Sequence, residues 1–314
     1  MSDGAKALPR WAMWTLVAGA LALVSAVTVR AVTVAGQTPA SDSLSAAQNV
    51  EARLEAIDDK TYGTWEQHSA GAYLDYLANT AAVEPCMADK GETFGYPFID
   101  PFAGRADSGL GSSWAAPLMR TTSSQNALAS ARYNWVAERE SDGNPDTNWY
   151  GQTKSYQRAY AQCRHLRKNH RGHPRGWLGV PNELAQLVFE AENPFGPTSE
   201  YDDCMLDAGY DVYWDDFGGP DAMHQMVEAE APVLDLPPDQ LVQTEEWKEY
   251  LAFEQDVLKA DYECRATRYA LVMAELDAPL AEFERSHAEE IAEMQAKWEA
   301  LVAEAKAQGW TPQT

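Results

Sequence analysis

Residues 204–209 read Cys-Met-Leu-Asp-Ala-Gly, and residues 86–91 read Cys-Met-Ala-Asp-Lys-Gly. A second cysteine follows each phrase, within Ala-Asp-Tyr-Glu-Cys-Arg at residues 260–265 and within Ala-Tyr-Ala-Gln-Cys-Arg at residues 159–164. All four cysteines of the chain therefore fall into two copies of one arrangement. The duplication favours pairing of Cys86 with Cys163 and of Cys204 with Cys264, while the other two pairings stay open. We predict two disulfide-stapled units.

These bridges are expected to be structural. The chain has no Cys-x-x-Cys motif, which redox-active thiols commonly use. Disulfides persist in oxidising compartments, so the sequence favours an exported protein. In the chain-entropy model, loops of this length stabilise the folded state by about 3 to 4.5 kcal/mol per bridge.

Composition indicates an acidic globular protein. Hydrophobic residues make up 45% of the 314 residues, which is enough for a sizeable core. The formal net charge of −24 argues against nucleic acid as a partner, because phosphate binding requires concentrated Lys and Arg. Solubility outside the cell is the simplest reason for so much acid, and a cationic partner is the alternative.

Residues 11–29 are uncharged and long enough to cross a bilayer as a helix. Lys6 and Arg10 precede this segment, so the positive-inside rule puts residues 1–10 in the cytoplasm and the rest outside. We predict a retained single-pass anchor at the cell membrane. The alternative is a cleaved signal, since residues 24–26 and 33–35 resemble cleavage sites. A lipoprotein anchor is excluded because no cysteine precedes Cys86.

The remainder divides into four predicted parts, and the fold class is mainly α. Residues 30–60 read as a tether with a short helix at about 44–57, followed by a first cysteine unit at 61–180 and a second at 181–275. Residues 276–308 form a C-terminal amphipathic helix. Gly91 and Gly209 stand where a helix end requires a left-handed residue. Helical spacing predicts further helices over residues 154–168, 182–192 and 245–268.

An apolar stripe runs along the C-terminal helix. Its members are spaced by three and four residues: Ile291, Met294, Trp298 and Leu301. We expect this stripe to pack on its own domain. The alternative is a coiled coil with a second copy or a partner, which makes these residues a candidate interaction face. The sequence does not determine the oligomeric state.

A basic island interrupts the acidic chain at residues 164–175. Its charges include Arg164, Arg167, Lys168 and Arg171. We expect it to dock on an acidic surface of the same molecule, and an anionic wall polymer is the alternative ligand. Cys163, His165, His170 and His173 could be taken for a zinc set, but the disulfide uses Cys163 and the spacing matches no standard site.

Other groups of residues give weaker evidence for a functional site. Residues 142–148 resemble a calcium loop but lack its glycine and its bidentate glutamate, so an Asx-rich turn is favoured. The scattered tryptophans favour packing over stacking on sugars. No nucleophile elbow, phosphate loop or zinc-protease helix occurs in the sequence. We therefore expect no cofactor and no metal.

The paired motifs resemble those of a group of exported actinobacterial cell-envelope proteins without an assigned function. The likeness covers mainly residues 204–303, where Cys-Met-x-x-x-Gly precedes Ala-Asp-Tyr-Glu-Cys-Arg and a Glu- and Ala-rich helix. A looser likeness covers residues 86–164. The resemblance implies a secreted or membrane-anchored, helical protein, and it assigns no catalytic residue.

The expected function is that of a non-enzymatic envelope protein that engages a protein or wall-polymer partner. The alternative is a cell-wall hydrolase that uses carboxylates near Asp203 and Asp215. Two carboxylates facing each other across a cleft at about 5 to 9 Å would distinguish the hydrolase.

Overall fold

The computed structural model describes residues 41–94, 98–105, 115–120, 122–139, 153–167, 173–174, 178–195, 199–212, 220–234 and 236–312. All of these residues belong to one compact unit, residues 38–314. Several sequence-based predictions lie outside them: the membrane segment at 11–29, the loop at 142–148, and Lys168, Arg171 and Asp215. Among the described residues, no helix has both the length and the apolar character that crossing a bilayer requires.

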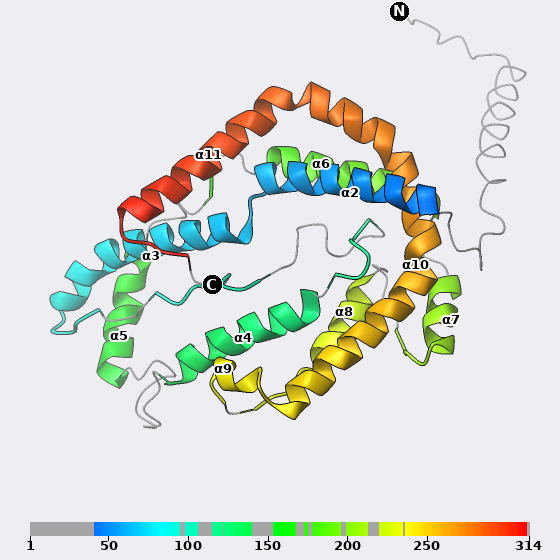
Figure 1. Ribbon diagram of the computed structural model, residues 1–314. Helices are drawn as coiled ribbons and strands as arrows, with labels where there is room; N and C mark the ends of the chain where they lie inside the picture. The colour runs from blue at the N-terminus through cyan, green and yellow to red at the C-terminus, as the bar shows by residue number, and fades with distance from the viewer. Residues whose placement is uncertain are drawn as a thin grey trace, which may run out of the picture. The chain divides into compact units, whose positions relative to one another are not determined.

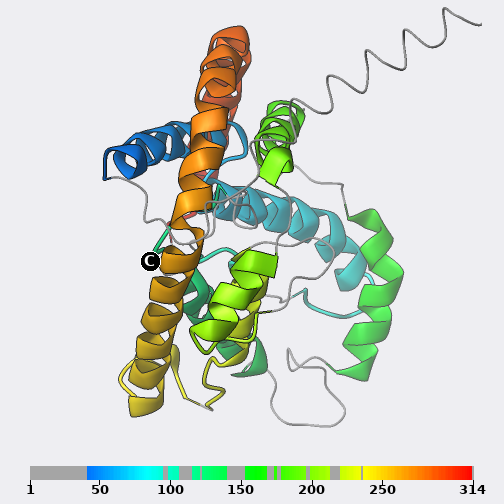
Figure 2. The ribbon, with the colours of Figure 1, turned by 90° about the vertical axis from the view of Figure 1, so that its right-hand side faces the viewer.

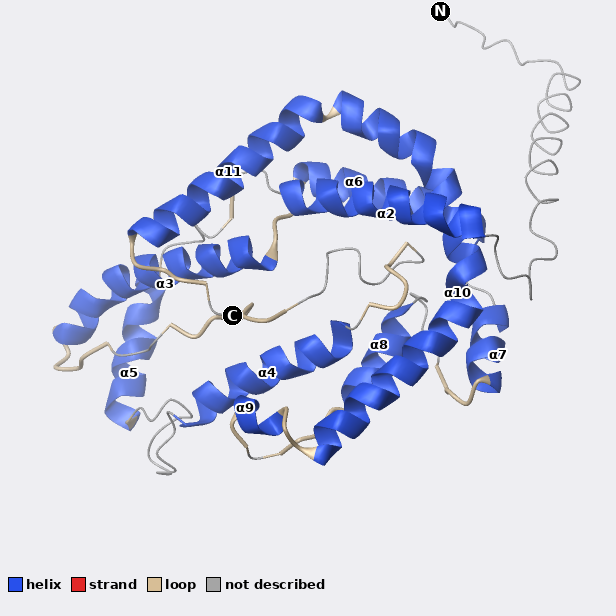
Figure 3. Cartoon of the chain, viewed as in Figure 1, coloured by secondary structure: helices blue, strands red, loops and turns tan. Residues whose placement is uncertain are grey.

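The mainly α prediction is confirmed, and the described residues contain no strand (Figure 3). The longer helices are α2 (Ser41–Thr61), α3 (Trp65–Ala88), α4 (Thr122–Arg139), α5 (Lys154–Cys163), α6 (Gly179–Glu192), α10 (Glu245–Ser286) and α11 (Ala288–Ala307). The shorter ones are α7 (Ser199–Asp207), α8 (Pro220–Ala229), α9 (Pro238–Leu241) and two 3-10 turns, Arg164–Leu166 and Asn193–Phe195.

The repeated glycines end their helices as the sequence predicted. Gly91 has φ +76 and Gly209 has φ +96, both in the left-handed region that suits glycine. The next amide in each copy reaches back to a helix carbonyl, Glu92 N to Met87 O at 3.0 Å and Tyr210 N to Met205 O at 2.8 Å. This is the Schellman type of helix end.

Threonines begin three of the helices. The Thr64 hydroxyl accepts the Gln67 amide at 3.3 Å, and the Gln67 side chain accepts the Thr64 amide at 2.7 Å, which completes a capping box at α3. Thr244 accepts the Trp247 amide at 3.1 Å at the start of α10. The Thr153 hydroxyl accepts the Tyr156 amide at the start of α5. These caps fix where each helix begins.

The main core forms around α10, the 42-residue helix that crosses Figure 1 from the yellow to the orange end. Helices α2, α6, α7 and α8 pack against it. Val50, Leu54 and Ile57 of α2 are buried in this core together with Tyr269 and Leu276 of α10. Residues 41–61 are therefore one packed helix, longer than the short helix predicted at about 44–57 within the tether of residues 30–60.

The C-terminal helix differs from the prediction as well. Residues 276–286 belong to α10, and His287 (φ −105, ψ 12) separates them from α11. The change of direction lets Leu280 and Phe283 enter the main core while Trp298 enters a second core. One straight helix could not supply side chains to both cores. Figure 2 shows α10 from a second side, running from its yellow start to its orange end.

The second core lies between α11 and α3. It is made of seven buried residues: Ala70, Leu74, Met294, Trp298, Leu301, Ala305 and Trp310. A third, smaller cluster surrounds Cys163 where α5 packs on α3, with Val83 and Met87 at its centre. Each of these cores is small, so the covalent links described next add substantially to the stability of the unit.

Candidate functional site

The two disulfides have the predicted local pairing. Cys86 of α3 is bonded to Cys163 of α5, and Cys204 of α7 is bonded to Cys264 of α10, each with Cα atoms 5.8 Å apart. Among described residues no cysteine is free. Such bridges are typical of an oxidising, extracytoplasmic environment. Because Cys163 is bonded to Cys86, it cannot serve as a thiolate ligand for zinc.

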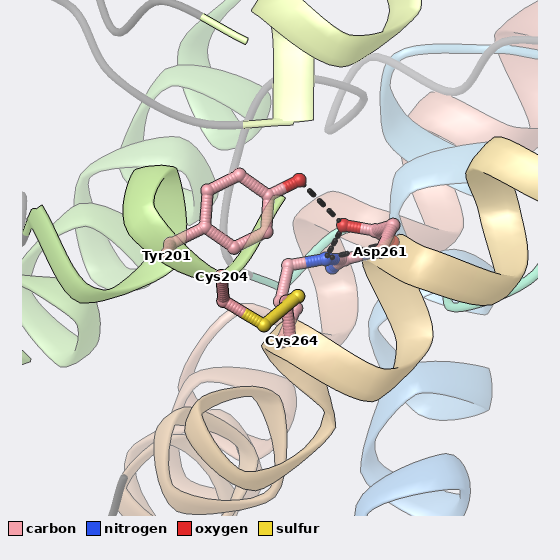
Figure 4. The surroundings of a disulfide bond; sticks show 5 residues. Tyr201, Cys204, Asp261 and Cys264 are labelled. Carbon is pink, nitrogen blue, oxygen red and sulfur yellow. Dashed lines mark hydrogen bonds and ion pairs between the residues drawn. A yellow bond between two sulfur atoms is a disulfide. The ribbon is translucent and has the colours of Figure 1, made fainter. Parts of the chain in front are cut away.

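A buried ion pair lies beside the second disulfide (Figure 4). The guanidinium of Arg265 donates to both carboxylate oxygens of Asp261, and the Tyr201 hydroxyl donates to the same carboxylate at 2.8 Å. Arg265 also donates to the carbonyl oxygens of Ala116 and Pro117 at 2.6 and 3.3 Å. The network thereby connects α7, α10 and the segment 115–120.

Burial and the charge of Asp261 together set the electrostatics of this network. The side chains of Asp261 and Arg265 are 0% and 1% exposed. Burial lowers the pKa of Arg265, but the charge and hydrogen bond of Asp261, with smaller contributions from Tyr201 and Tyr269, raise that pKa above its usual value. Burial also raises the pKa of Tyr201, and Asp261 adds to this shift. The network is fully paired and closed to solvent, so its role is structural.

The two sequence copies differ at this point. Asp261 corresponds to Tyr160 in the first copy, and Arg265 corresponds to Arg164. Arg164 has no acidic neighbour in its motif and is exposed. An Asp and an Arg four residues apart in a predicted helix are the sequence signal for this buried pair, which was not among the predicted site residues.

The basic island is only partly described. Arg164, His165 and Arg167 are exposed, and neither arginine forms an ion pair within the described part of the chain. The Arg167 guanidinium lies 5.8 Å from the centre of the Tyr160 ring. The predicted docking of this island on an acidic surface is therefore not seen for the two arginines that the structure describes.

The apolar stripe of α11 is covered by the chain itself. Ile291, Met294, Trp298 and Leu301 are 0 to 8% exposed. Helix α11 packs on α2 and α3, and the Trp298 indole donates to the Thr61 carbonyl oxygen at 3.1 Å. A partner could reach these four side chains only by displacing α2 or α3. The candidate interaction face considered for this stripe is therefore not exposed.

Beside this buried stripe lies an open groove of about 600 Å³ between α3 and α11. Its apolar walls come from both helices and include Leu77, Ala78, Ala81 and Ala300. His173 and Pro174 also line it. Lys297 and Glu304 are the charged residues of the lining. The size falls in the range typical of ligand-binding clefts.

A cluster of rings lies next to the groove. The His68 ring is 5.0 Å from Trp298 and 5.2 Å from His173, measured between ring centres. Trp65 and Phe102 stack at 5.3 Å and also contact His68. Burial, with a smaller contribution from His173, lowers the pKa of His68 to about 4, so this ring is neutral at pH 7.

The described lining of the groove contains no pair of facing carboxylates. Only one carboxylate, that of Glu304, lines it. Asp202 and Asp203 are adjacent on α7, where burial and then the charge of Asp203 raise the pKa of Asp202. Neither aspartate lines this groove. No group of three or more metal-binding side chains occurs in the part of the chain described.

One serine–histidine pair was not apparent from the sequence. Ser123 Oγ lies 3.0 Å from His224 Nδ1, and the Ser124 amide donates to buried Glu254 at 3.0 Å. Ser123 is 1% exposed, so a substrate could not reach its hydroxyl. These contacts join α4 to α8 and α10, so we interpret them as polar contacts that stabilise the interior.

No protein-family model, no curated protein and no solved structure matches this chain. The fold and the groove therefore define its class directly, as a disulfide-linked, mainly helical protein with an apolar surface groove.

Proposed function

We propose that the protein is a non-enzymatic binding protein of the cell envelope. It is anchored by residues 11–29, exposes its helical part outside the cytoplasm and engages a partner protein through the groove between α3 and α11. The observation that carries this proposal is the groove itself, an open cleft of about 600 Å³ with largely apolar walls. Clefts of this volume with apolar walls and a few polar groups are typical of binding sites.

Several features favour a protein over a wall polymer as the partner. Sugars bind on exposed aromatic platforms, but Trp247, Trp298 and Trp310 are 0 to 5% exposed and Trp65 is stacked on Phe102. The groove walls are aliphatic instead. A net charge of −24 also disfavours an anionic polymer.

Location is tested by fractionation combined with thiol labelling. The full-length protein should enter the membrane fraction, and a thiol reagent added to intact cells should label it only after reduction. Recovery of intact protein in the cytosol with four free thiols would contradict the anchor and the extracytoplasmic location together.

Partner binding is tested by cross-linking in intact cells. A photo-reactive residue at Ala81, which is exposed and lines the groove, should give a defined cross-linked protein. The same probe at Ala252, exposed on α10, is the matched control. Equal products from both sites, or none from Ala81, would contradict binding in the groove.

A further inference from the structure

Resting on the proposed function, we propose that the occupant of the groove is an amphipathic helix of the partner, with Lys or Arg residues beside its apolar stripe. The groove walls, the core beneath them and the charge at the rim all fit such a helix.

Both walls are helical stripes. On α3 the lining residues are Leu74, Leu77, Ala78 and Ala81, and on α11 they are Lys297, Ala300, Leu301 and Glu304, followed by Gln308 at the C-cap. Each set steps by three and four residues. At 1.5 Å per residue the lining extends about 10 Å along α3 and about 16 Å along α11, which corresponds to two or three helical turns. A helix that anchors through positions i, i+3, i+4 and i+7 matches this length.

Small side chains let a third helix approach closely. Ala78, Ala81 and Ala300 line the groove beside larger leucines, and Ala81 and Ala300 are exposed. Helices pack about 8 to 10 Å apart, depending on the side chains at the contact, so alanines favour a close approach. An apolar stripe of Leu or Ile on the incoming helix would fill the space above them.

The groove is preformed over a packed core. Leu74 and Leu301 are 6% and 8% exposed and connect its walls to the second core, where Trp298 is fully buried. Tyr73 donates to the Gln308 carbonyl oxygen at 3.1 Å, which fixes the end of α11 against α3. A preformed groove binds with a smaller entropy cost than one that must be ordered.

The uncompensated charge at the rim is negative. Lys297 is neutralised by Glu293 on its own helix at 2.8 Å. The Glu304 carboxylate forms no ion pair with any described residue, and its one described side-chain contact is from the neutral Gln308 amide at 3.4 Å. A helix carrying Lys or Arg beside its stripe would complement this carboxylate.

The same charge disfavours a second copy as the occupant. The chain is acidic overall, with a net charge of −24, so two copies repel each other at low salt. The apolar stripe of its own α11 is already buried. The structure therefore points to a different protein with a basic amphipathic segment.

Three labelled peptides of about 18 residues test the inference by fluorescence anisotropy on the full-length protein in nanodiscs, with empty nanodiscs as the background. The first has a leucine stripe flanked by lysines. The second has the same stripe flanked by glutamates. The third has the composition of the first in an order that destroys the stripe. The first should bind at least about tenfold more tightly than the other two, because it alone matches both walls and rim.

Matched variants assign the binding to the groove. Ala300→Trp fills the groove and should weaken the lysine peptide about tenfold, whereas Ala252→Trp on α10 should leave it unchanged. Glu304→Gln should weaken the lysine peptide severalfold and leave the glutamate peptide unweakened. Circular dichroism checks that each variant keeps its helical fold.

Equal binding of the ordered and disordered lysine peptides would show simple charge attraction and overturn the inference, as would insensitivity to Ala300→Trp. If no peptide binds but a cross-linked protein still forms from Ala81, the binding function stands and the helical occupant is wrong. If the peptide binds in the groove but the protein is cytosolic, the occupant stands and the envelope location is wrong.

Discussion

Gly63 has no space for a side chain because Trp298 occupies it: a Cβ built at Gly63 would lie 2.6 Å from Cε2 and 2.7 Å from Cζ2 of the indole. The two residues are far apart in sequence, and Gly63 lies in the turn between α2 and α3. Gly63 has φ +96, which side-chain-bearing residues rarely adopt. The turn and α11 therefore fix each other's position.

Gly63→Ala is predicted to destabilise the protein more than its backbone angle alone requires. Gly209 has the same φ of +96 but no atom within 4 Å of its Cβ position, so Gly209→Ala measures the angle without the contact. We expect a loss of about 1 to 2 kcal/mol for Gly209→Ala and about 3 to 4 kcal/mol for Gly63→Ala. Urea denaturation of both variants measures the difference. Equal losses would mean that the indole moves aside at little cost.

Trp298→Ala is predicted to cost about 3 to 5 kcal/mol, because the indole is fully buried and donates to the Thr61 carbonyl oxygen. The contacts are within one chain, so the loss should not change with protein concentration. Thermal melts at two concentrations, together with sedimentation, test both statements. A melting temperature that rises with concentration only in the wild type would show that the stripe also contacts a second copy.

Removing a disulfide is predicted to lower the melting temperature by roughly 5 to 15 °C. The bridges join residues separated by 77 and 60 positions, so each should contribute about 4 kcal/mol in the chain-entropy model. The paired variants Cys86→Ala with Cys163→Ala and Cys204→Ala with Cys264→Ala avoid leaving a free thiol. Calorimetry with and without reductant provides the control. Reductant should lower the melting temperature of the wild type by breaking both bridges, and that of each variant by breaking only the bridge that remains. Unchanged melting after removal of either pair would contradict a structural role.

The duplicated cysteine phrase favoured the two disulfide pairs that the structure shows and marked Gly91 and Gly209 as left-handed helix ends, and helical spacing predicted the mainly α class. These features depend on local sequence, which spacing and residue type report directly. The break at His287 was not predictable in the same way. The apolar spacing continues through His287. The change of direction is needed only because the apolar residues before it enter the main core and those from Met294 onward enter the second core.

The groove was beyond sequence reasoning for a related reason. Leu77 and Ala81 lie on α3, more than two hundred residues before Ala300, and no local pattern marks them as facing one another. The sequence drew attention to the Trp298 stripe, which the structure shows to be buried. Periodicity identifies an apolar face but does not say whether another part of the same chain covers it.

Arg265→Met is predicted to cost about 3 to 5 kcal/mol, because it leaves Asp261 buried without its cation. Adding Asp261→Asn should recover part of this loss, since the remaining group is then neutral. Arg53→Met is the matched control: Arg53 pairs with Asp277 and Glu284 at 2.6 Å but is 34% exposed, so its loss should stay below about 1 kcal/mol. Urea midpoints of the four proteins give the comparison. A similar loss for Arg265→Met and Arg53→Met would show that the buried pair contributes no more than a surface pair.

The buried His68 is predicted to make the protein sensitive to acid. Its pKa is lowered to about 4 in the folded state by burial and by His173, whereas an unfolded histidine titrates near 6.5. Between these values the unfolded chain binds more protons, so stability rises with pH through this window. The contribution of His68 is fully present above about pH 6.5 and is lost as the pH falls toward 4, by an amount on the order of 3 kcal/mol.

The comparison of variants isolates this effect from other titrating groups. Burial raises the pKa of Glu51 and of Asp59, so these carboxyls change the stability in the opposite direction as the pH falls. Glu51 and Asp59 are present in the wild type and in both variants, so their effect cancels when the proteins are compared. His68→Phe should therefore flatten the decline in stability between pH 6.5 and 4.5, while His165→Gln, at an exposed site, should retain it. Urea denaturation at intervals of about half a pH unit measures both slopes. Parallel curves for the wild type and His68→Phe would mean that His68 is protonated in the folded state at the same pH as in the unfolded chain, and that the ring cluster beside the groove is open to water.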